Sequence, residues 1–277
     1  MADVMAALKE AFGAFKKNIA GCLIYTFVFL LACTVVLGIM LAILFVFSII
    51  TAGSIVGAMF TGTSSIVSLV LIGGALLVLL LGMLITFWFF SGLVGSYYDA
   101  LHSLLVARKP SIGGFFTGIP KKATPIFLAE LIQGLIIFVP TFALAIIAAI
   151  VSGGSGIASI AIQMISGLYS AVIAFLTVFI AAAVVVDGKG GISSLQHSMS
   201  LVSRNIVTMI IYTLSGFVLA LPIAIAVGVP MALSIITQNS IVQVLLGLGV
   251  LFSLAYTALF FLPVMVLFNM SLYRKLK

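Results

Sequence analysis

Charged residues are scarce in this sequence of 277 residues. Asp, Glu, Lys and Arg make up 6% of the chain and hydrophobic residues 64%, with a mean hydropathy of +1.47. A water-soluble fold of this length would lack the polar side chains needed to cover its surface. The composition therefore excludes a soluble enzyme or binding domain and indicates that lipid surrounds most of the chain.

Three long stretches contain no charged residue at all: residues 18–98, 131–186 and 205–273. A membrane span needs roughly 20 apolar residues to cross a hydrocarbon core of about 30 Å, so each stretch is long enough for two spans. The apolar runs are continuous and do not alternate at every second residue, as barrel strands do. Helices satisfy all backbone hydrogen bonds within one segment, so the stretches are expected to be helical.

Turn-forming residues stand near the middle of each stretch, at 51–65, 152–156 and 237–240. The sequence therefore predicts an all-α polytopic membrane protein with six transmembrane helices, arranged as three hairpins in a single domain spanning residues 1–277. The expected spans are 19–50, 66–98, 125–151, 158–186, 206–236 and 241–271. The three hairpin units are about 1–98, 110–186 and 187–277.

Lysine and arginine, twelve in total, occur only outside the hairpin turns. They precede the first span, separate the second from the third and the fourth from the fifth, and follow the sixth. The positive-inside rule then predicts a multi-pass protein of the cell membrane with both termini cytoplasmic.

The same basic residues account for the net charge of +7. They are expected to extend to the headgroups as interfacial anchors, which makes membrane lipids the expected partners. Nucleic acid is not expected as a partner, because no soluble basic domain is long enough to bind it. The anchors that directly precede spans are Lys16, Lys17, Lys121, Lys122 and Arg204.

One segment appears twice in the chain. Moved by 187 positions, residues 191–213 align with residues 4–26, and the matched pairs are Leu8 with Leu195, Lys17 with Arg204, Asn18 with Asn205, and Tyr25 with Tyr212. A weaker version surrounds residues 111–116, where Ser111 is placed to cap a helix. The sequence thus predicts an internal repeat in which a short amphipathic elbow helix precedes each hairpin.

The first elbow carries apolar residues at helical spacing, namely Met5, Leu8, Phe12 and Phe15. This pattern predicts a helix that lies in the membrane interface before the chain enters the bilayer. The same stripe could instead pack against other helices of the protein, and neither periodicity nor charge separates the two alternatives.

Glu130 is the only acidic residue inside an apolar run. An ionisable group at membrane depth suggests a functional role, and Gln133, nearly one turn further on, is its expected companion in a polar intramembrane site. The structural alternative is that Glu130 reaches the interface or pairs with a basic residue near Lys122.

Sequence signals for chemistry are absent. The two cysteines, Cys22 and Cys33, are roughly 16 Å apart along one predicted helix and cannot bond to each other. With two histidines in the chain, neither a metal motif nor a hydrolase motif is present. We therefore expect no metal, no cofactor and no enzymatic activity.

The run V-V-V-D-G-K-G-G-I-S-S-L-Q-H-S-M-S-L-V-S-R-N-I from Val184 and the closing F-N-M-S-L-Y-R-K-L-K resemble a broad prokaryotic, largely archaeal, superfamily of six-span proteins. That superfamily includes the membrane domain found beside glycerophosphodiester phosphodiesterases and several families of unknown function. The segment A-R-K-P-S-I-G-G-F-F-T-G-I-P-K-K is similar to the first cytoplasmic loop of archaeal members. The resemblance implies the six-span topology and carries over no catalytic residue.

Three functions remain open at this level. The first is a non-enzymatic scaffold, assembly or regulatory protein that binds a protein partner or a second copy of itself. The second is a transporter or lipid-handling channel that uses Glu130 and Gln133 together with helices bent at Pro140, Pro222 or Pro230. A membrane enzyme would require His102, His197 and an acidic residue to converge.

Overall fold

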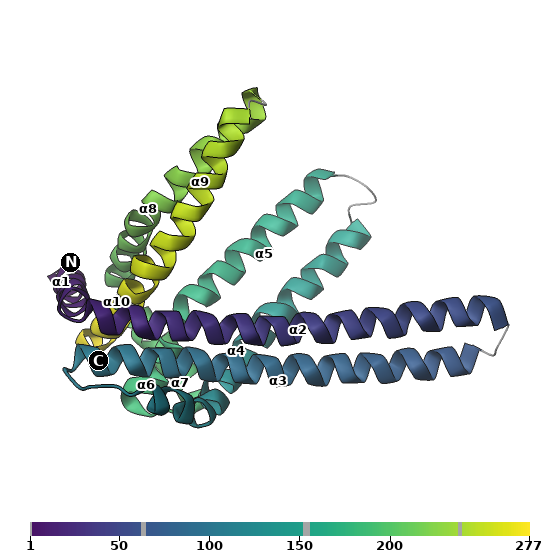
Figure 1. The fold of residues 1–277 in the computed structure, drawn as a ribbon, viewed down its shortest axis with the longest axis horizontal. Coiled ribbons are helices and arrows are strands. Elements are labelled where there is room, and N and C mark those ends of the chain that lie inside the picture. Colours follow the sequence, from purple (N-terminus) through teal and green to yellow (C-terminus); the bar gives the residue numbers. More distant parts are fainter. Residues whose placement is uncertain (1, 62–64, 152–155, 238–239) are drawn as a thin grey trace.

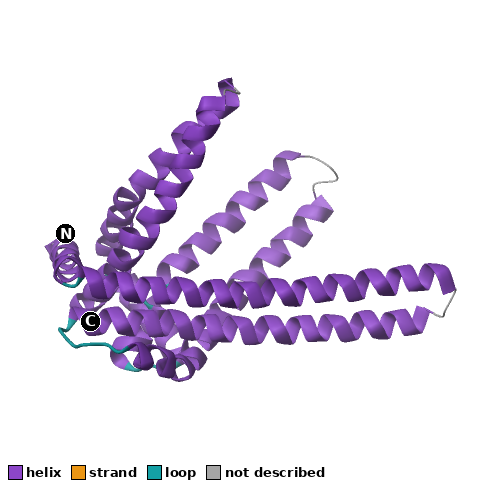
Figure 2. Cartoon of the chain, viewed as in Figure 1, coloured by secondary structure: helices purple, strands orange, loops and turns teal. Residues whose placement is uncertain are grey.

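The computed structural model describes residues 2–61, 65–151, 156–237 and 240–277, and every regular element among them is a helix (Figure 1, Figure 2). The predicted all-α class is confirmed. In chain order the elements are α1 (Ala2–Lys17), α2 (Ile19–Thr61), α3 (Ser65–Leu105), α4 (Ile112–Val151), α5 (Gly156–Leu176), α6 (Ile180–Asp187), α7 (Gly191–Arg204), α8 (Ile206–Thr237), α9 (Ser240–Tyr256), the π-helix η1 (Thr257–Phe261) and α10 (Leu262–Leu276).

Six helical segments are long and apolar enough to cross a membrane, as predicted: Ile19–Gly53, Ile72–Leu105, Ile112–Ala149, Ile160–Asp187, Ile206–Ser234 and Ser240–Leu276. They form the pairs α2/α3, α4/α5 and α8/α9, which diverge from one end of the molecule (Figure 1). Helix α2 has 43 residues. At 1.5 Å per residue it is roughly 65 Å long, about twice the hydrocarbon thickness and more than one crossing requires.

The predicted turns agree with the structure only in part. Helix α2 continues to Thr61, through most of the predicted turn at 51–65. The centre of that predicted turn is therefore helical, and the first span does not end at residue 50 as expected. Residues 62–64, 152–155 and 238–239 lie outside the described residues, and the turns predicted at 152–156 and 237–240 fall on them. Gly53 lies among apolar residues. A turn inside the membrane would leave backbone N–H and C=O groups without water to form hydrogen bonds with, so a continued helix is favoured.

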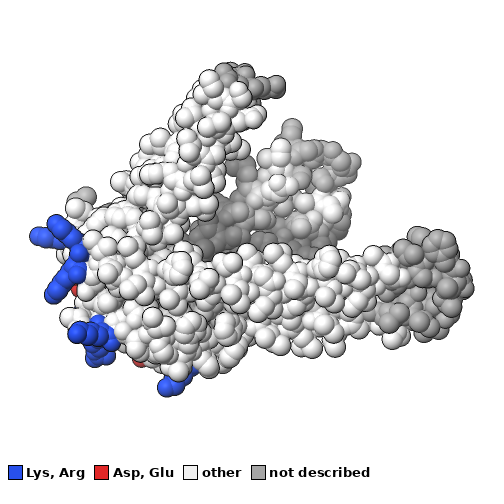
Figure 3. Space-filling view, viewed as in Figure 1, with Lys and Arg blue, Asp and Glu red and all other residues white. Residues whose placement is uncertain are grey.

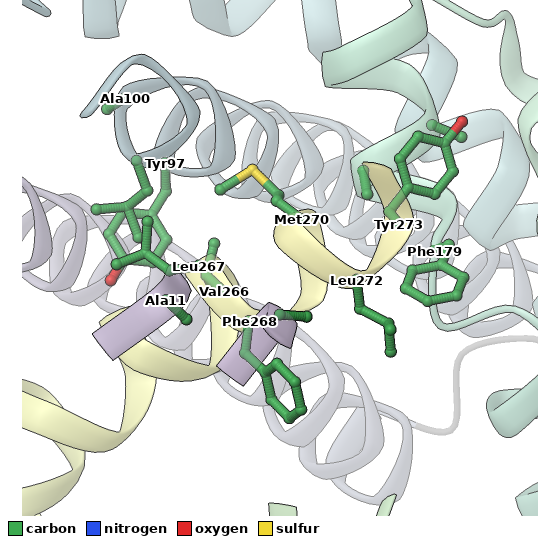
Figure 4. Packing of buried hydrophobic residues seen from close by; sticks show 14 of the residues in the cluster. Ala11, Tyr97, Ala100, Phe179, Val266, Leu267, Phe268, Met270, Leu272 and Tyr273 are labelled. Carbon is green, nitrogen blue, oxygen red and sulfur yellow. The ribbon is translucent and has the colours of Figure 1, made fainter. Parts of the chain in front are cut away.

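The buried core lies at the end where the hairpins meet, which we call the base. It is formed by α1, α6, α7 and α10 together with the adjoining ends of α2, α3, α4 and α8. Helix α10 lies at its centre, and seven of its residues are fully buried: Val264, Leu267, Phe268, Met270, Ser271, Leu272 and Tyr273. Five of them are labelled in Figure 4. Both chain termini lie at the base (Figure 1).

Beyond the base the hairpins present apolar side chains on their surfaces. Phe45 on α2, Val78 on α3 and Phe217 on α8 are each more than 60% exposed. Such surfaces are unfavourable in water and favourable against lipid or against other membrane helices.

The first elbow, α1, packs directly on α10. Its buried face consists of Val4, Ala7 and Ala11, while Met5 of the predicted apolar stripe is 59% exposed. The small alanine side chains let two helix backbones approach closely. The rest of the stripe is partly buried, and the Phe12 and Phe15 rings pack against Phe260 of η1. The first elbow therefore packs within the protein, while its position in the membrane interface stays a prediction.

The predicted second elbow is not a separate helix. Helix α4 runs without interruption from Ile112 to Val151, and Ser111 caps it by accepting a 2.9 Å hydrogen bond from the Gly114 backbone N–H. The capping prediction is confirmed, but the elbow expected before the third span forms the first turns of that span.

The elbows α1 and α7 end in the same way. Lys17 is followed by Asn18 and then by α2, and Arg204 is followed by Asn205 and then by α8. The Asn18 Nδ2 donates to the Ala14 carbonyl at 3.2 Å, and the Asn205 Nδ2 donates to the Leu201 carbonyl at 2.9 Å. Each bond returns to the residue four positions earlier. These matching bonds support the predicted internal repeat, which stays a prediction.

Candidate functional site

The predicted polar site lies where α3 crosses α4 at the base. The Ser91 hydroxyl of α3 donates a 2.5 Å hydrogen bond to the Glu130 Oε2 of α4. Glycine allows this close approach: a Cβ atom on Gly92 would lie 2.6 Å from the Ile119 side chain and 2.8 Å from its carbonyl oxygen. Small residues at such crossings let membrane helices pack backbone to backbone.

Two further polar contacts join the same helices. The Trp88 Nε1 donates to the Thr124 Oγ1 at 3.1 Å, and the Lys122 ammonium forms a 2.5 Å ion pair with the Asp99 carboxylate. Lys122 therefore differs from the free interfacial anchor that the sequence predicts, since its side chain is only 18% exposed. A carboxylate facing it across the interface, which sequence spacing does not reveal, is the reason.

The other predicted anchors point outward. Lys16, Lys17, Lys121 and Arg204 are exposed, and none of them pairs with an acidic side chain among the described residues. The visible basic side chains gather at the base, and the hairpin surfaces in the same view carry none (Figure 3).

Glu130 and Gln133 are both partly buried. Within the described part of the chain, Glu130 is bonded to Ser91 and to no basic residue, and the Gln133 side chain has no hydrogen bond. Among the described residues, grooves lie at the base, along the α2/α3 hairpin and on the α4/α5 hairpin. Neither Glu130 nor Gln133 lines any of them.

A second polar centre surrounds a break in the fourth span, between α5 and α6. At residues 177–179 the helix is interrupted, and Ser198 of α7 fills the gap: its hydroxyl donates to the Leu176 carbonyl at 3.0 Å and accepts from the Phe179 N–H at 3.1 Å. Buried backbone groups without partners are unfavourable, so Ser198 stabilises the interruption.

Asn269 of α10 completes this centre. Its Nδ2 donates to the Val178 carbonyl at 3.3 Å and to the Tyr212 hydroxyl at 3.2 Å, and the residue is 2% exposed. Sequence reasoning missed both Ser198 and Asn269 as structural residues. Asn269 stands among apolar residues of α10, which is a signal, whereas Ser198 lies in a helix with many polar residues, and nothing in the sequence distinguishes it from them.

The glycine segment between α6 and α7 has two structural roles. Gly188 has a φ of 64°, and its N–H closes the end of α6 on the Val184 carbonyl. Gly191 lies so close to α4 that a Cβ atom would come within 2.8 Å of the Leu128 side chain and 2.9 Å of the Pro125 carbonyl. Gly188 therefore ends α6, and Gly191 permits a close contact with α4.

The chain ends are held by acidic residues. Asp187 accepts a 2.6 Å hydrogen bond from the Tyr273 hydroxyl and pairs with Lys277. Glu10 accepts a 2.6 Å bond from the Ser271 hydroxyl and pairs with Arg274 at 3.4 Å and Lys275 at 3.5 Å. Because these contacts join α1, α6 and α10, they close the base around its core.

The two histidines lie beside different acidic residues. His197 packs against the Tyr273 ring, with ring centroids 5.8 Å apart, and is electrostatically coupled to Asp187, whereas His102 is coupled to Asp99. Burial lowers the pKa of His197, the positive charge of Lys189 lowers it further, and Asp187 acts in the opposite direction. Among the described residues there is no group of three His, Cys, Asp or Glu side chains that could hold a metal ion.

No protein-family model, no curated protein and no solved structure matches this chain. The resemblance to the six-span superfamily accordingly stays a prediction. The fold itself defines the class: six long apolar helices that leave one base make the chain a multi-pass α-helical membrane protein.

Proposed function

We propose that this protein is a non-enzymatic membrane scaffold whose hairpins bind the transmembrane helices of a protein partner. The observation that supports the proposal most strongly is the division between base and hairpins. Buried side chains concentrate in the base, while among the helices beyond it α2 packs mainly on α3, α5 mainly on α4 and α9 mainly on α8.

The separation of the hairpins is clearest for α4/α5 and α8/α9. Helix α5 packs on α4 and α7, and α9 packs on α8 and η1, with no substantial packing of α5 on α8 or α9 in the part of the chain that is described. Two hairpins with apolar faces and little contact between them leave surfaces that other membrane helices can occupy. A conducting pathway would instead need helices that enclose a polar channel.

The environment of Glu130 favours the scaffold over a transporter. Glu130 is bonded to a neighbouring helix through Ser91. A hydrogen-bonded carboxyl between two helices is the arrangement expected for helix association. An enzymatic role has less support, since His102 and His197 stand beside different acids.

We further propose that the base faces the cytoplasm, with both termini there. The support is the distribution of Lys and Arg, all of which lie between the spans or in the parts of the spans next to the base, and none of which lies in the described parts of the hairpin tips.

Site-specific photo-crosslinking in the native membrane tests the scaffold proposal. A crosslinking amino acid is placed at Val78, Phe142 or Leu251, each more than 50% exposed on a different hairpin, and at Met5 of α1 as a control on the base. A discrete protein adduct from one or more hairpin positions, absent at Met5, is expected. Adducts to lipid alone at all three positions would contradict the proposal, and adducts of twice the chain mass would identify a second copy as the partner.

Reconstituted vesicles provide the complementary test of the alternative function. Flux of ions and of lipid between leaflets is measured for the natural protein and for Glu130→Gln. The scaffold proposal predicts no flux above that of protein-free vesicles for either protein. Flux that Glu130→Gln abolishes would overturn it in favour of transport.

A further inference from the structure

A cavity of about 890 Å³ lies at the base, between the α1–α2 junction and the connection from α3 to α4. We call it the basal cavity. Its lining includes Glu10, Lys17, Ile24, Arg108, Lys109 and Ile112. They come from segments about ninety positions apart in the sequence, so folding assembles the cavity.

Three cations line the basal cavity without compensating negative charge. Lys17, Arg108 and Lys109 are exposed, and none pairs with an acidic side chain among the described residues. The one acidic residue of the lining is Glu10, and its carboxylate is already engaged by Ser271, Arg274 and Lys275. The cavity therefore presents a net positive charge.

The connection that carries two of these cations has a defined shape. Ala107 adopts a left-handed conformation with φ of 56°, and the Arg108 N–H donates to the Ser103 carbonyl at 2.7 Å. The Asn18 Nδ2, next to Lys17, lies 3.5 Å from the Leu104 carbonyl. The contact between Asn18 and Leu104 joins the connection to the α1–α2 junction. Lys17 and Arg108 therefore line the same cavity.

The lining of the basal cavity also includes apolar side chains. Ile24 stands five residues into α2, roughly 8 Å along the helix axis, and is 49% exposed; Ile112 at the start of α4 is 50% exposed. Ile24 lies in the first membrane-length segment, and Ile112 begins the third. A cationic rim beside apolar side chains at the membrane boundary matches the two parts of a phospholipid, its phosphate and its acyl chains.

We propose that the basal cavity binds one anionic glycerophospholipid. Lys17, Arg108 and Lys109 contact the phosphate, and the first methylene groups of the acyl chains lie against Ile24 and Ile112. The guanidinium of Arg108 can present two parallel donors to phosphate oxygens, while the two lysines add point charges. This site is independent of the scaffold function, since it involves the base and not the hairpins.

Lipid titration of the full chain in a neutral detergent tests the proposal, with native mass spectrometry as the readout. The probes are phosphatidylglycerol as the anionic lipid and phosphatidylcholine as the neutral one. The cavity variant is Lys17→Gln/Arg108→Gln/Lys109→Gln. Its matched control is Lys16→Gln/Lys121→Gln/Arg204→Gln, which removes three equally exposed, unpaired cations outside the cavity.

We expect one phosphatidylglycerol to bind the natural protein at least ten times more tightly than phosphatidylcholine. If each cation contributes about a five-fold gain, the cavity variant should bind on the order of 100-fold more weakly. The control variant should bind phosphatidylglycerol less than about ten-fold more weakly than the natural protein. Equal losses in the two variants would show general surface attraction and overturn the proposal.

Two further measurements distinguish loss of the lipid site from misfolding, and a membrane lipid from a soluble ligand. The single variant Arg108→Gln should weaken phosphatidylglycerol binding by about five-fold, and an unchanged affinity would overturn the proposal even if the triple variant misfolds. Glycerol 3-phosphate, added up to millimolar concentrations, should not displace the lipid. Displacement by this soluble phosphate would mean that the site takes a soluble ligand and not a membrane lipid.

Discussion

Ser91 and Glu130 share a 2.5 Å hydrogen bond across the crossing of α3 and α4. The pair joins the first hairpin to the second, and Ser91 is fully buried. Glu130 can thus be explained by helix association, although an acidic residue in an apolar run suggests transport when the sequence is considered alone.

Replacing Ser91 by Ala should destabilise the protein. The carboxyl of Glu130 would lose its partner in a partly buried position, at a cost on the order of 1 kcal/mol. For a chain of this size that corresponds to a fall of about 2–4 °C in the unfolding temperature. Differential scanning fluorimetry in detergent measures this fall in the unfolding temperature.

The double variant Ser91→Ala/Glu130→Ala measures the energy of the hydrogen bond apart from each residue's other contacts. Its loss of stability should be smaller than the sum of the losses in the two single variants, because either single change already removes the hydrogen bond. Glu130→Gln keeps an acceptor for the Ser91 hydroxyl and should cost less than Glu130→Ala. Additive losses would show that the two side chains are not energetically coupled.

Gly92→Ala should also destabilise the α3–α4 contact. The added methyl group would meet the Ile119 carbonyl oxygen 2.8 Å away, and overpacking of this kind costs about 1–3 kcal/mol. Gly73→Ala on the same helix is the matched control, because nothing lies within 4 Å of its Cβ position. In the control, the better helix propensity of alanine should leave the unfolding temperature unchanged or raise it. Equal effects of the two changes would be inconsistent with a close crossing at Gly92.

Ser198→Ala should weaken the base at the interruption of the fourth span. The change removes the partner of both the Leu176 carbonyl and the Phe179 N–H, with an expected cost of about 1–3 kcal/mol. Ser193→Ala on the exposed side of α7 serves as the control and should change the free energy of unfolding by less than about 0.5 kcal/mol. Hydrogen exchange should show faster exchange of the Phe179 amide in Ser198→Ala only; an unchanged rate would argue against this role.

Acidification should lower stability through His197. Its pKa lies below the ordinary value of 6.5 in the folded protein, so the unfolded chain binds the proton more tightly. Stability attributable to this residue is therefore complete above about pH 6.5 and decreases as the pH falls below it. The unfolding temperature of the natural protein should drop more between pH 7.5 and 5.5 than that of His197→Asn. Equal drops in both proteins would assign the pH dependence to other groups.

The class and the helix hairpins could be predicted because they depend on long-range averages of the sequence. Eighty-one consecutive residues without charge, from Asn18 to Tyr98, determine two spans whatever the packing details. Helix ends with a local cause were also accessible, since Ser111 caps α4 with its own side chain and Gly188 ends α6 through a left-handed backbone.

Features that depend on contacts between distant segments could not be predicted. The interruption at residues 177–179 contains neither proline nor glycine, and its cause is a serine about twenty positions later. The pairing of Lys122 with Asp99 and the alanine face of α1 likewise depend on which helices meet. Periodicity identifies an apolar stripe, but it does not show whether lipid or α10 will cover it.

The most direct test of the account is the sidedness of the base relative to the hairpin tips. In a variant with Cys22 and Cys33 replaced by alanine, single cysteines are placed at Lys121 on the base and at Ser240 at the start of α9, both exposed positions. A membrane-impermeant maleimide added to intact cells should label Ser240→Cys at once and Lys121→Cys only after the membrane is permeabilised. Labelling of both from the same side would contradict three hairpins that cross one membrane from a common base.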